Sequence, residues 1–275
     1  MAIEQDIVIA VARNSNKTIQ LANSDLDFSQ YTCNIDDLVI DKTNPKWYHY
    51  FLCGCKGILD HFTLTDPVGL CLMVDGTVPR SAGLSSSSAF VCAAALATMQ
   101  ANNKQCTKLE LADICQHCEK YIGTEGGGMD QSIAFLAEPG TAKLIQFNPI
   151  RATDINLPPG AVFVISNSCV QMSKAITSHF NTRVMECRLA AKLLAKSKGF
   201  NWKSVQKLGD VQMKFGVSLK DMLQIVKDIL HREPYDKNEI CSILDITTEE
   251  LDDDILNEKT RHVHSKLLPR YLVPS

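Results

Sequence analysis

The sequence predicts an α/β protein, and its length fits one large domain or two modest ones. Three short runs have the β-branched, apolar composition of strands: residues 7–12, 18–22 and 68–74. Segments with apolar residues at helical spacing follow them, among them 47–62 and 107–122. From residue 173 onward the pattern is helical. Strands that alternate with helices, followed by a helical region, are typical of this fold class.

Composition excludes several classes of protein. The chain has 275 residues, of which 45% are hydrophobic and 21% charged, as in a globular protein rather than a disordered or collagen-like one. A net charge of −3 gives no basic field for nucleic acid or an anionic membrane. The apolar run at 7–12 is too short for a signal sequence or a membrane span. An odd number of cysteines, 11, argues against a disulfide framework. We expect a soluble, cytoplasmic monomer.

The elements of the first half follow one another closely. Residues 23–45 are polar and give only weak strand signals. The segment 89–100 is apolar nearly all round, which predicts a buried helix. Thr107 and Glu110 form the sequence pattern of a capping box, so the next helix should begin there. The turn Asp75-Gly76 should end the strand at 68–74.

A boundary between domains is expected at Pro158-Pro159-Gly160. It separates two runs with strand composition, 141–147 and 161–166. Three helices are expected beyond it: residues 173–196, 203–215 and 219–230. Seven acidic residues and no basic ones lie in 245–258, which is typical of a solvated helix face.

A serine-rich loop joins the strand at 68–74 to the apolar helix at 89–100. It reads Pro79-Arg80-Ser81-Ala82-Gly83-Leu84, followed by the four serines 85–88. The first turn of a helix presents unpaired N–H groups and partial positive charge, which bind phosphate. Gly83 permits close approach of the backbone, and serine hydroxyls can contact phosphate or Mg²⁺. The alternative is a serine-rich cap or linker, although a linker should not lead directly into an apolar helix. No Gly-Lys-Ser/Thr follows, so this is not a Walker loop.

Two acidic residues flank a second glycine-rich loop. Glu119 lies near the end of the helix at 107–122, and Asp130 follows the run Gly126-Gly127-Gly128-Met129. Phosphoryl transfer uses one carboxylate to hold a metal ion and another to orient or deprotonate the attacking hydroxyl. A helix C-cap at Gly123 and an N-capping Asp130 explain the same residues about as well.

Two cysteine pairs have spacings that zinc ligands use: Cys53-x-Cys55 and Cys115-x-x-Cys118. Both pairs lie in apolar, helical segments, and no second Cys-x-x-Cys or His pair completes a ligand set. We therefore expect these cysteines to pack in the core.

Taken together, the two loops resemble signatures of the GHMP small-molecule kinases. The first is Pro79-x-x-x-Gly83-Leu84-Ser85-Ser86-Ser87-Ser88-Ala89, and the second is Gly127-Gly128-Met129-Asp130-Gln131. The segments 121–132 and 178–194 are most similar to the galactokinase branch, and within it to kinases of N-acetylgalactosamine. The resemblance covers about residues 2–257. It implies an ATP-dependent sugar 1-kinase, acting on N-acetylgalactosamine or galactose, with two α/β domains that meet at the active-site cleft.

The resemblance implies roles in binding phosphate and metal. Gly83, Ser85 and Ser86 would hold the phosphates of ATP. Ser87 and Glu119 would hold Mg²⁺.

The resemblance also implies roles toward the sugar and the rest of the nucleotide. Asp130 would be the catalytic base toward the anomeric hydroxyl, with Gly127 close to the sugar. Ser173 and Lys174 would add contacts to the nucleotide. The adenine pocket would be lined by Trp47 and Tyr50, an aromatic pair that a plain core would also explain.

In domain terms, the resemblance implies three parts: a nucleotide-binding domain without its first strands at 1–157, a partial, largely helical domain at 158–258, and a divergent tail at 259–275. Galactokinases carry a sugar signature ending in Gly-Glu-His-x-Asp-Tyr, an arginine upstream of it and a third, glycine-rich motif, none of which occurs in the 275 residues. We therefore expect the middle of such a kinase, as in a splice form or partial gene model, with background activity. The alternative is an inactive remnant that binds nucleotide or a partner. A third interpretation, membership of a different GHMP branch, is disfavoured by the similarity to the galactokinase branch around Gly126 and Phe180.

Overall fold

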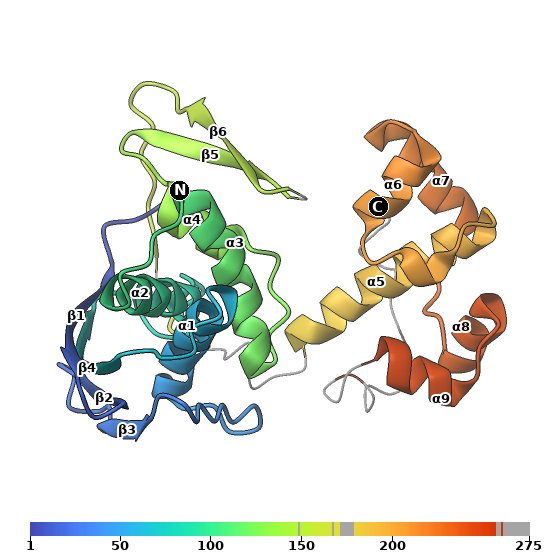
Figure 1. Cartoon of the computed structure of the whole chain (residues 1–275). Helices are drawn as coiled ribbons and strands as arrows, with labels where there is room; N and C mark the ends of the chain where they lie inside the picture. The colour runs from blue at the N-terminus through green and yellow to red at the C-terminus, as the bar shows by residue number, and fades with distance from the viewer. Residues whose placement is uncertain (148, 167, 171–178, 257–259, 261–275) are drawn as a thin grey trace. The chain divides into compact units, whose positions relative to one another are not determined.

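The structure, a computed structural model, divides into two compact units (Figure 1). The residues that it describes are 1–147, 149–166, 168–170, 179–256 and 260. Unit 1 comprises Met1–Thr177 and unit 2 comprises Ser178–Ser275. The contacts thus divide the chain after residue 177, whereas the sequence suggested a boundary at 158. Each unit has a core of its own and is described by itself.

Among its described residues, unit 1 combines two sheets with four α-helices. Its strands are β1 (Ile7–Asn14), β2 (Thr18–Asn23), β3 (Tyr31–Asn34), β4 (Gly69–Gly76), β5 (Thr141–Gln146) and β6 (Arg151–Asn156). Its helices are α1 (Trp47–His61), α2 (Ser86–Ala101), α3 (Lys108–Cys118), the 3₁₀-helix η1 (Glu119–Ile122) and α4 (Met129–Leu136). The predicted strands and helices of the first half are confirmed, and the capping box of Thr107 and Glu110 begins α3.

The larger sheet has the strand order β1-β4-β2-β3. β4 pairs antiparallel with β1 and parallel with β2, while β2 and β3 form an antiparallel pair. β3 and α1 supply the crossover that the parallel pair requires. The expected turn at Asp75-Gly76 was wrong: both residues belong to β4 and pair with Val8 and Ile7 of β1.

One face of this sheet packs against α1 and α2. Leu21 and Leu72 on the sheet are buried with Phe51 of α1 and Phe90 of α2. The predicted apolar helix is thus buried, as expected, and it lies over the sheet in Figure 1. Phe90 also matters for the site, because it fixes the first turns of α2 against the sheet.

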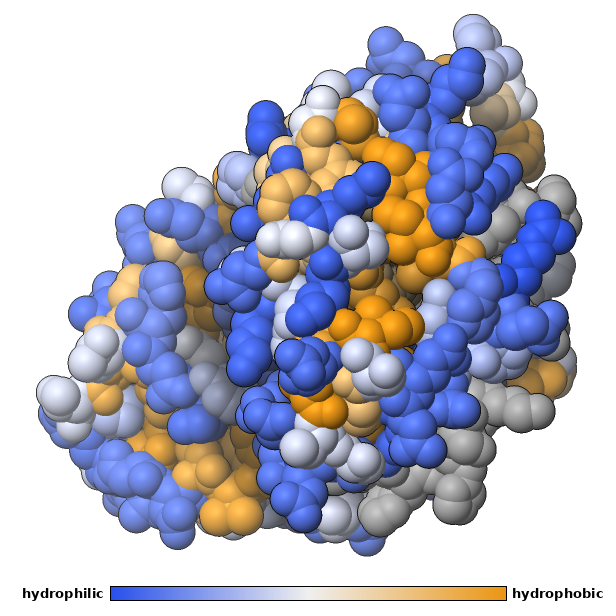
Figure 2. All heavy atoms as spheres, turned by 90° about the vertical axis from the view of Figure 1, so that its right-hand side faces the viewer, coloured by the Kyte–Doolittle hydropathy of each residue, from blue (hydrophilic) through white to orange (hydrophobic). Residues whose placement is uncertain are grey.

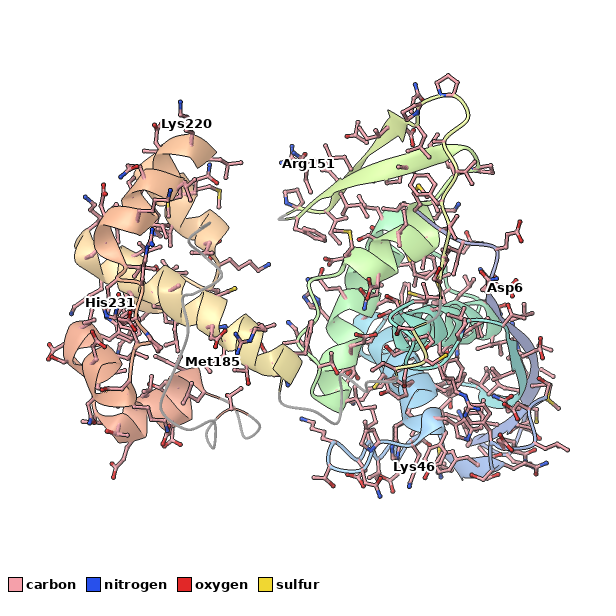
Figure 3. The ribbon with its side chains drawn as sticks, turned by 180° about the vertical axis from the view of Figure 1, so that it is seen from behind. Asp6, Lys46, Arg151, Met185, Lys220 and His231 are labelled. Carbon is pink, nitrogen blue, oxygen red and sulfur yellow. The ribbon has the colours of Figure 1, made fainter. Side chains whose placement is uncertain are left out.

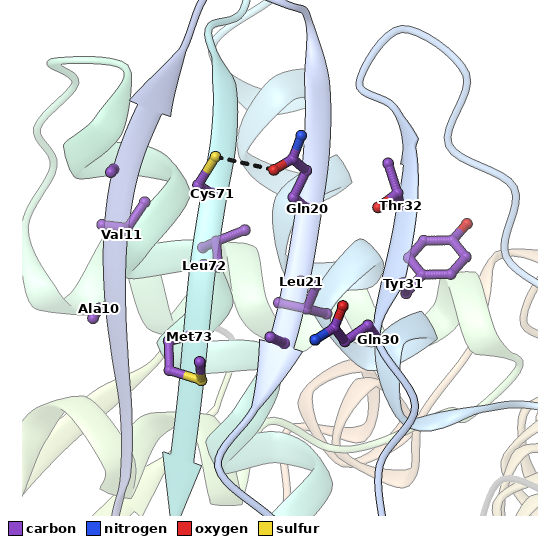
Figure 4. A pocket seen from close by; sticks show the side chains of 12 residues that line it. Ala10, Val11, Gln20, Leu21, Gln30, Tyr31, Thr32, Cys71, Leu72 and Met73 are labelled. Carbon is purple, nitrogen blue, oxygen red and sulfur yellow. Dashed lines mark hydrogen bonds between the residues drawn. The ribbon is translucent and has the colours of Figure 1, made fainter. Parts of the chain in front are cut away.

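The opposite face of the sheet carries the alternate residues. Gln20, Cys71 and Met73 lie there and line a shallow hollow (Figure 4). The Cys71 thiol donates a hydrogen bond to Gln20 Oε1 at 3.5 Å. Met73 is about half exposed, so an apolar side chain on this face of the sheet is accessible to solvent.

Cysteine side chains pack in the core where α1, α2 and α3 meet. Cys53, Cys92, Cys115 and Cys118 are buried in one cluster. Burial raises the pKa of the Cys53 thiol, and a bond to Cys115 together with burial raises the pKa of Cys118. Within the described residues no group of three or more His, Cys, Asp or Glu side chains could hold a metal ion.

Gly54 lets α1 and α2 approach closely, and this contact gives a stability prediction. A Cβ at position 54 would overlap the carbonyl oxygen of Val91 and lie 2.9 Å from the Ala95 nitrogen, so the backbone of α2 would have to move. We expect Gly54→Ala to lower the free energy of unfolding by about 1–3 kcal/mol, although alanine is the better helix former. Urea denaturation measures the change. Gly209→Ala is the control, because open space surrounds Gly209 in its helix; equal effects of the two substitutions would refute the explanation.

β5 and β6 form a separate antiparallel hairpin. The sequence predicted β5 and missed β6, whose residues are mostly polar. The strand predicted at 161–166 is wrong, because these residues have no strand pairing in the structure and Val162 and Val164 are exposed. β-branched composition favours a strand only where a neighbouring strand is present to pair with it.

Unit 2 is helical. Its elements are α5 (His179–Ser197), the 3₁₀-helix η2 (Trp202–Ser204), α6 (Leu208–Phe215), α7 (Leu219–Ile229), α8 (Lys237–Leu244), α9 (Thr248–Glu250) and the π-helical turn η3 (Leu251–Ile255). The helix predicted at 203–215 is interrupted, because the Asp210 carboxylate accepts from the N–H groups of Gln206 and Lys207 and so begins a new helix. Residues 173–178 of the first predicted helix lie outside the described residues.

The core of unit 2 surrounds α5. Leu194 and Met185 of α5 are buried with Ile240 of α8, and Met185 is labelled in Figure 3. Lys192 is also buried: it donates to the Val205 carbonyl at 3.0 Å and lies over the Trp202 ring, 5.3 Å from its centroid. Burial lowers the pKa of Lys192.

Apolar side chains also reach the surface of unit 2. Figure 2 shows such side chains gathered on the face turned to the viewer, and Met213, Leu219 and Leu223 are among the exposed ones of this unit. The acidic segment at 245–258 is only partly a solvated face, since Leu251 and Ile255 are buried. No helix among the described residues is long and apolar enough to span a membrane.

Candidate functional site

The serine loop takes a constrained path into α2. Ser81, Gly83 and Ser85 all have positive φ angles, 53°, 79° and 61°. Positive φ is the ordinary choice for glycine, but it costs serine of the order of 1 kcal/mol or more. Contacts outside the loop must therefore stabilise this conformation.

The N-terminus of α2 is open to a ligand. Ser85 is the N-cap residue, and its side chain makes no capping hydrogen bond. The first turn contains no acidic residue of its own, and the carboxylate that reaches it is that of Glu119, which accepts a hydrogen bond from Ser88 in this turn. Ser86 and Ser87 are partly exposed in this first turn. Free N–H groups beside two hydroxyls suit an anion such as phosphate.

Glu119 is held in place by hydrogen bonds from α2. The residue as a whole is only 5% exposed. Oε1 accepts a hydrogen bond from the Ser88 hydroxyl at 2.6 Å, and Gln131 Nε2 donates to the same hydroxyl at 3.4 Å. Three elements, α2, η1 and α4, are therefore joined through the Ser88 hydroxyl.

Ser88 and Gln131 were not singled out from the sequence as site residues. Ser88 was part of the serine motif, but Ser87 was expected beside the metal. The structure brings the Ser88 hydroxyl to Glu119. A carboxylate with an adjacent hydroxyl provides the hard oxygen donors that Mg²⁺ prefers, and phosphate oxygens would complete such a site.

The second glycine loop positions the start of α4. Gly128 has a φ of 88° and caps the helix, and a Cβ there would lie 2.6 Å from Gln116 Oε1. Only glycine therefore fits without strain. Asp130 lies in the first turn of α4 and is partly exposed, while Gly127 is exposed with open space beside its Cα.

A further contact fixes the turn that carries Glu119. Tyr121 in η1 donates its hydroxyl to Asp60 Oδ2 of α1 at 2.5 Å, and burial together with this bond raises the pKa of Tyr121. Lys56 pairs with the same carboxylate at 3.4 Å. η1 is thus tied to α1 on one side and to α2 on the other.

Trp47 lies at the start of α1, next to Lys46, which Figure 3 labels. Its ring stacks on Phe90 at 5.9 Å between centroids, and its Nε1 donates to the Ser29 carbonyl at 3.0 Å. Tyr50 is partly buried against the core. Ser173 and Lys174 lie outside the described residues.

The comparisons with known proteins agree with these motifs. Residues 49–138 match the GHMP kinases N terminal domain. A galactokinase from Dictyostelium discoideum is 40% identical over 260 residues, which are 91% of this chain and 52% of that protein. A galactokinase from Candida maltosa is 37% identical over 150 residues, which are 53% of this chain and 70% of that protein.

A solved structure agrees at the level of the fold. The structure of Lactococcus lactis galactokinase complexed with galactose is similar with a TM-score of 0.63 and 18% identity, over 88% of this chain and 58% of that one.

The chain belongs to the GHMP kinase family. Within this family it belongs to the galactokinase branch, and it spans about half the length of the Dictyostelium relative.

Proposed function

We propose that the chain is the nucleotide-binding part of an ATP-dependent sugar 1-kinase that acts on N-acetylgalactosamine, galactose or both. One observation carries the proposal: the open N-terminus of α2, the buried Glu119 and the first turn of α4 with Asp130 meet within unit 1. Phosphoryl transfer depends mainly on positioning and electrostatic stabilisation, and these are the groups that it requires.

The serine loop would hold the phosphates of ATP. The N–H groups at the start of α2 and the partly exposed hydroxyls of Ser85, Ser86 and Ser87 would supply donors, and Gly83 leaves room for a phosphate against the backbone. Glu119 and the serine hydroxyls would hold Mg²⁺, which neutralises charge on the phosphates when it is bound. Ser88 fixes the direction of the Glu119 carboxylate.

Asp130 would serve as the base. Its carboxylate would accept the proton of the anomeric hydroxyl as that oxygen attacks the γ-phosphorus, and the bond from that phosphorus to the bridging oxygen of ADP would break. Gly127 leaves open space where the sugar would approach.

The choice of sugar rests on sequence similarity. The segments 121–132 and 178–194 strongly resemble kinases of N-acetylgalactosamine. The relatives are named galactokinases, and one of the similar structures contains galactose. Both sugars therefore belong in the assay.

An alternative is a protein that binds nucleotide without sugar turnover. The 275 residues contain no Gly-Glu-His-x-Asp-Tyr sugar signature, and this observation favours the alternative for the chain on its own. Nucleotide binding and sugar-dependent ATP consumption, measured on the same preparation, separate the two functions.

The proposal predicts that replacing Ser86 and Ser87 together with alanine abolishes binding of Mg-ATP. The double substitution removes two donors from the first turn of α2, and alanine retains the helix. Calorimetry at fixed Mg²⁺ measures the affinity. Ser197→Ala, in α5 of the other unit, is the control. Unchanged affinity in the double variant would remove the serine loop from the site.

A further inference from the structure

Arg80 connects the serine loop to the loop between β2 and β3. Its guanidinium lies 3.6 Å from Asp25 Oδ2 and 3.9 Å from Asp27 Oδ2. The guanidinium carbon also lies over the ring of Phe28, 4.5 Å from the centroid. One arginine thus makes two ion pairs and a cation–π contact with a single short loop.

The contact continues from Phe28 to α2. The Phe28 ring lies 5.3 Å from the Trp47 ring, and Trp47 stacks on Phe90. Phe90 lies in α2, about one turn beyond Ser86. The series Arg80, Phe28, Trp47 and Phe90 begins at the second residue of the serine loop and ends just after the loop, so it holds both ends of the segment between them; we call it the aromatic clamp.

The clamp provides external contacts that the strained loop requires. Between Arg80 and α2 lie the three residues with positive φ, Ser81, Gly83 and Ser85. A conformation of this kind persists only where the surroundings determine it. Fixing the residues on either side of the loop restricts the alternative paths of the backbone between them.

Charge gives Arg80 a second effect. Asp25 and Asp27 place two carboxylates beside the start of the serine loop, and unpaired they would repel an incoming polyphosphate. The Arg80 guanidinium offsets this charge. This effect on an anionic ligand is separate from the small contribution of exposed ion pairs to folding stability.

We propose that Arg80 is a positioning residue for the nucleotide: through the aromatic clamp it holds the serine loop in its phosphate-binding conformation and keeps Trp47 in place. This inference rests on the proposed function, because it assigns the loop to the phosphates of ATP. It adds a residue that neither signature motif specifies, since position 80 is variable in the motif pattern Pro79-x-x-x-Gly83.

The test uses the full chain with Trp202→Phe as the parent, so that Trp47 is the single remaining tryptophan. Mg-ATP affinity is measured by calorimetry, and the exposure of Trp47 by acrylamide quenching of its fluorescence. Arg80→Ala should weaken binding about five- to tenfold and increase quenching. Arg80→Lys should recover part of the affinity, because lysine retains the charge but not the planar contact with Phe28. Arg13→Ala, in β1 of the same unit and paired with Asn103, is the matched control.

Each outcome decides a separate question. Weaker binding and greater quenching in Arg80→Ala, with Arg13→Ala unchanged, support the inference. Parent-like affinity in Arg80→Ala overturns it even if the melting temperature falls, because Arg80 then contributes only to stability. If the parent itself does not bind Mg-ATP, the proposed function fails. If the parent does not bind Mg-ATP but Arg80→Ala still increases the quenching of Trp47, Arg80 keeps Trp47 in place without any role in nucleotide binding. That result also overturns the inference.

Discussion

Asp130→Asn is expected to reduce the rate of sugar phosphorylation by about 10²–10⁴-fold, the usual contribution of a positioned general base. Asparagine has nearly the same shape but cannot accept the proton of the anomeric hydroxyl at neutral pH. ATP affinity should remain, because we propose that the phosphates bind at the start of α2 rather than at α4.

The experiment measures ATP consumption with galactose and with N-acetylgalactosamine. It is carried out on the chain and on a version extended with the sugar signature of the family, since we expect only background turnover from the 275 residues alone. Asp113→Asn, an exposed carboxylate on α3, is the control. Near-native turnover by the Asp130 variant would mean that Asp130 orients the sugar or stabilises the start of α4. Clear sugar-dependent turnover by the unextended chain, lost in Asp130→Asn, would contradict the expected background activity.

Glu119→Gln should remove the effect of Mg²⁺ on ATP binding. The carboxylate is buried and faces the start of α2, so a metal ion between it and the phosphates would gain a full negative charge as ligand. Glutamine can still accept the Ser88 hydrogen bond but is neutral. We expect affinity with Mg²⁺ to fall at least about tenfold, toward the value measured without metal.

Calorimetry with and without Mg²⁺ separates this effect from a general loss of binding. Ser88→Ala should weaken the metal effect less, because it removes only the hydrogen bond that orients the carboxylate. Glu110→Gln, an exposed carboxylate at the start of α3, is the control. Equal Mg²⁺ dependence in Glu119→Gln and the parent would exclude Glu119 as a ligand.

Local patterns predicted much of this fold. The capping box of Thr107 and Glu110 is formed by residues three apart, so the start of α3 was evident from the sequence. The apolar composition of α2 predicted burial because a helix without a polar face requires contacts on all sides. The two loops that make the candidate site were also evident from the sequence. Glycine permits close approach of the backbone, and serine supplies hydroxyl groups at the start of a helix.

Contacts between distant residues could not be predicted in the same way. Nothing local indicates that β4 lies between β1 and β2, or that the polar run at 151–156 pairs with β5. The bond between Ser88 and Glu119 joins residues 31 positions apart, and only the packing of α2 against η1 selects Ser88 over its neighbours. The segment 161–166 has strand composition but pairs with no other strand among the described residues. Composition alone therefore does not determine whether a neighbouring strand is present.

The unequal burial of the cysteines provides a means of labelling the native protein. Of the 11 thiols, only Cys169 and Cys187 are exposed, one in each unit. Burial and the neighbouring Glu186 raise the pKa of Cys187, which slows its reaction with a maleimide at neutral pH. Two dyes attached in sequence would then report the separation of the two units in solution, and nucleotide could be added to the same sample.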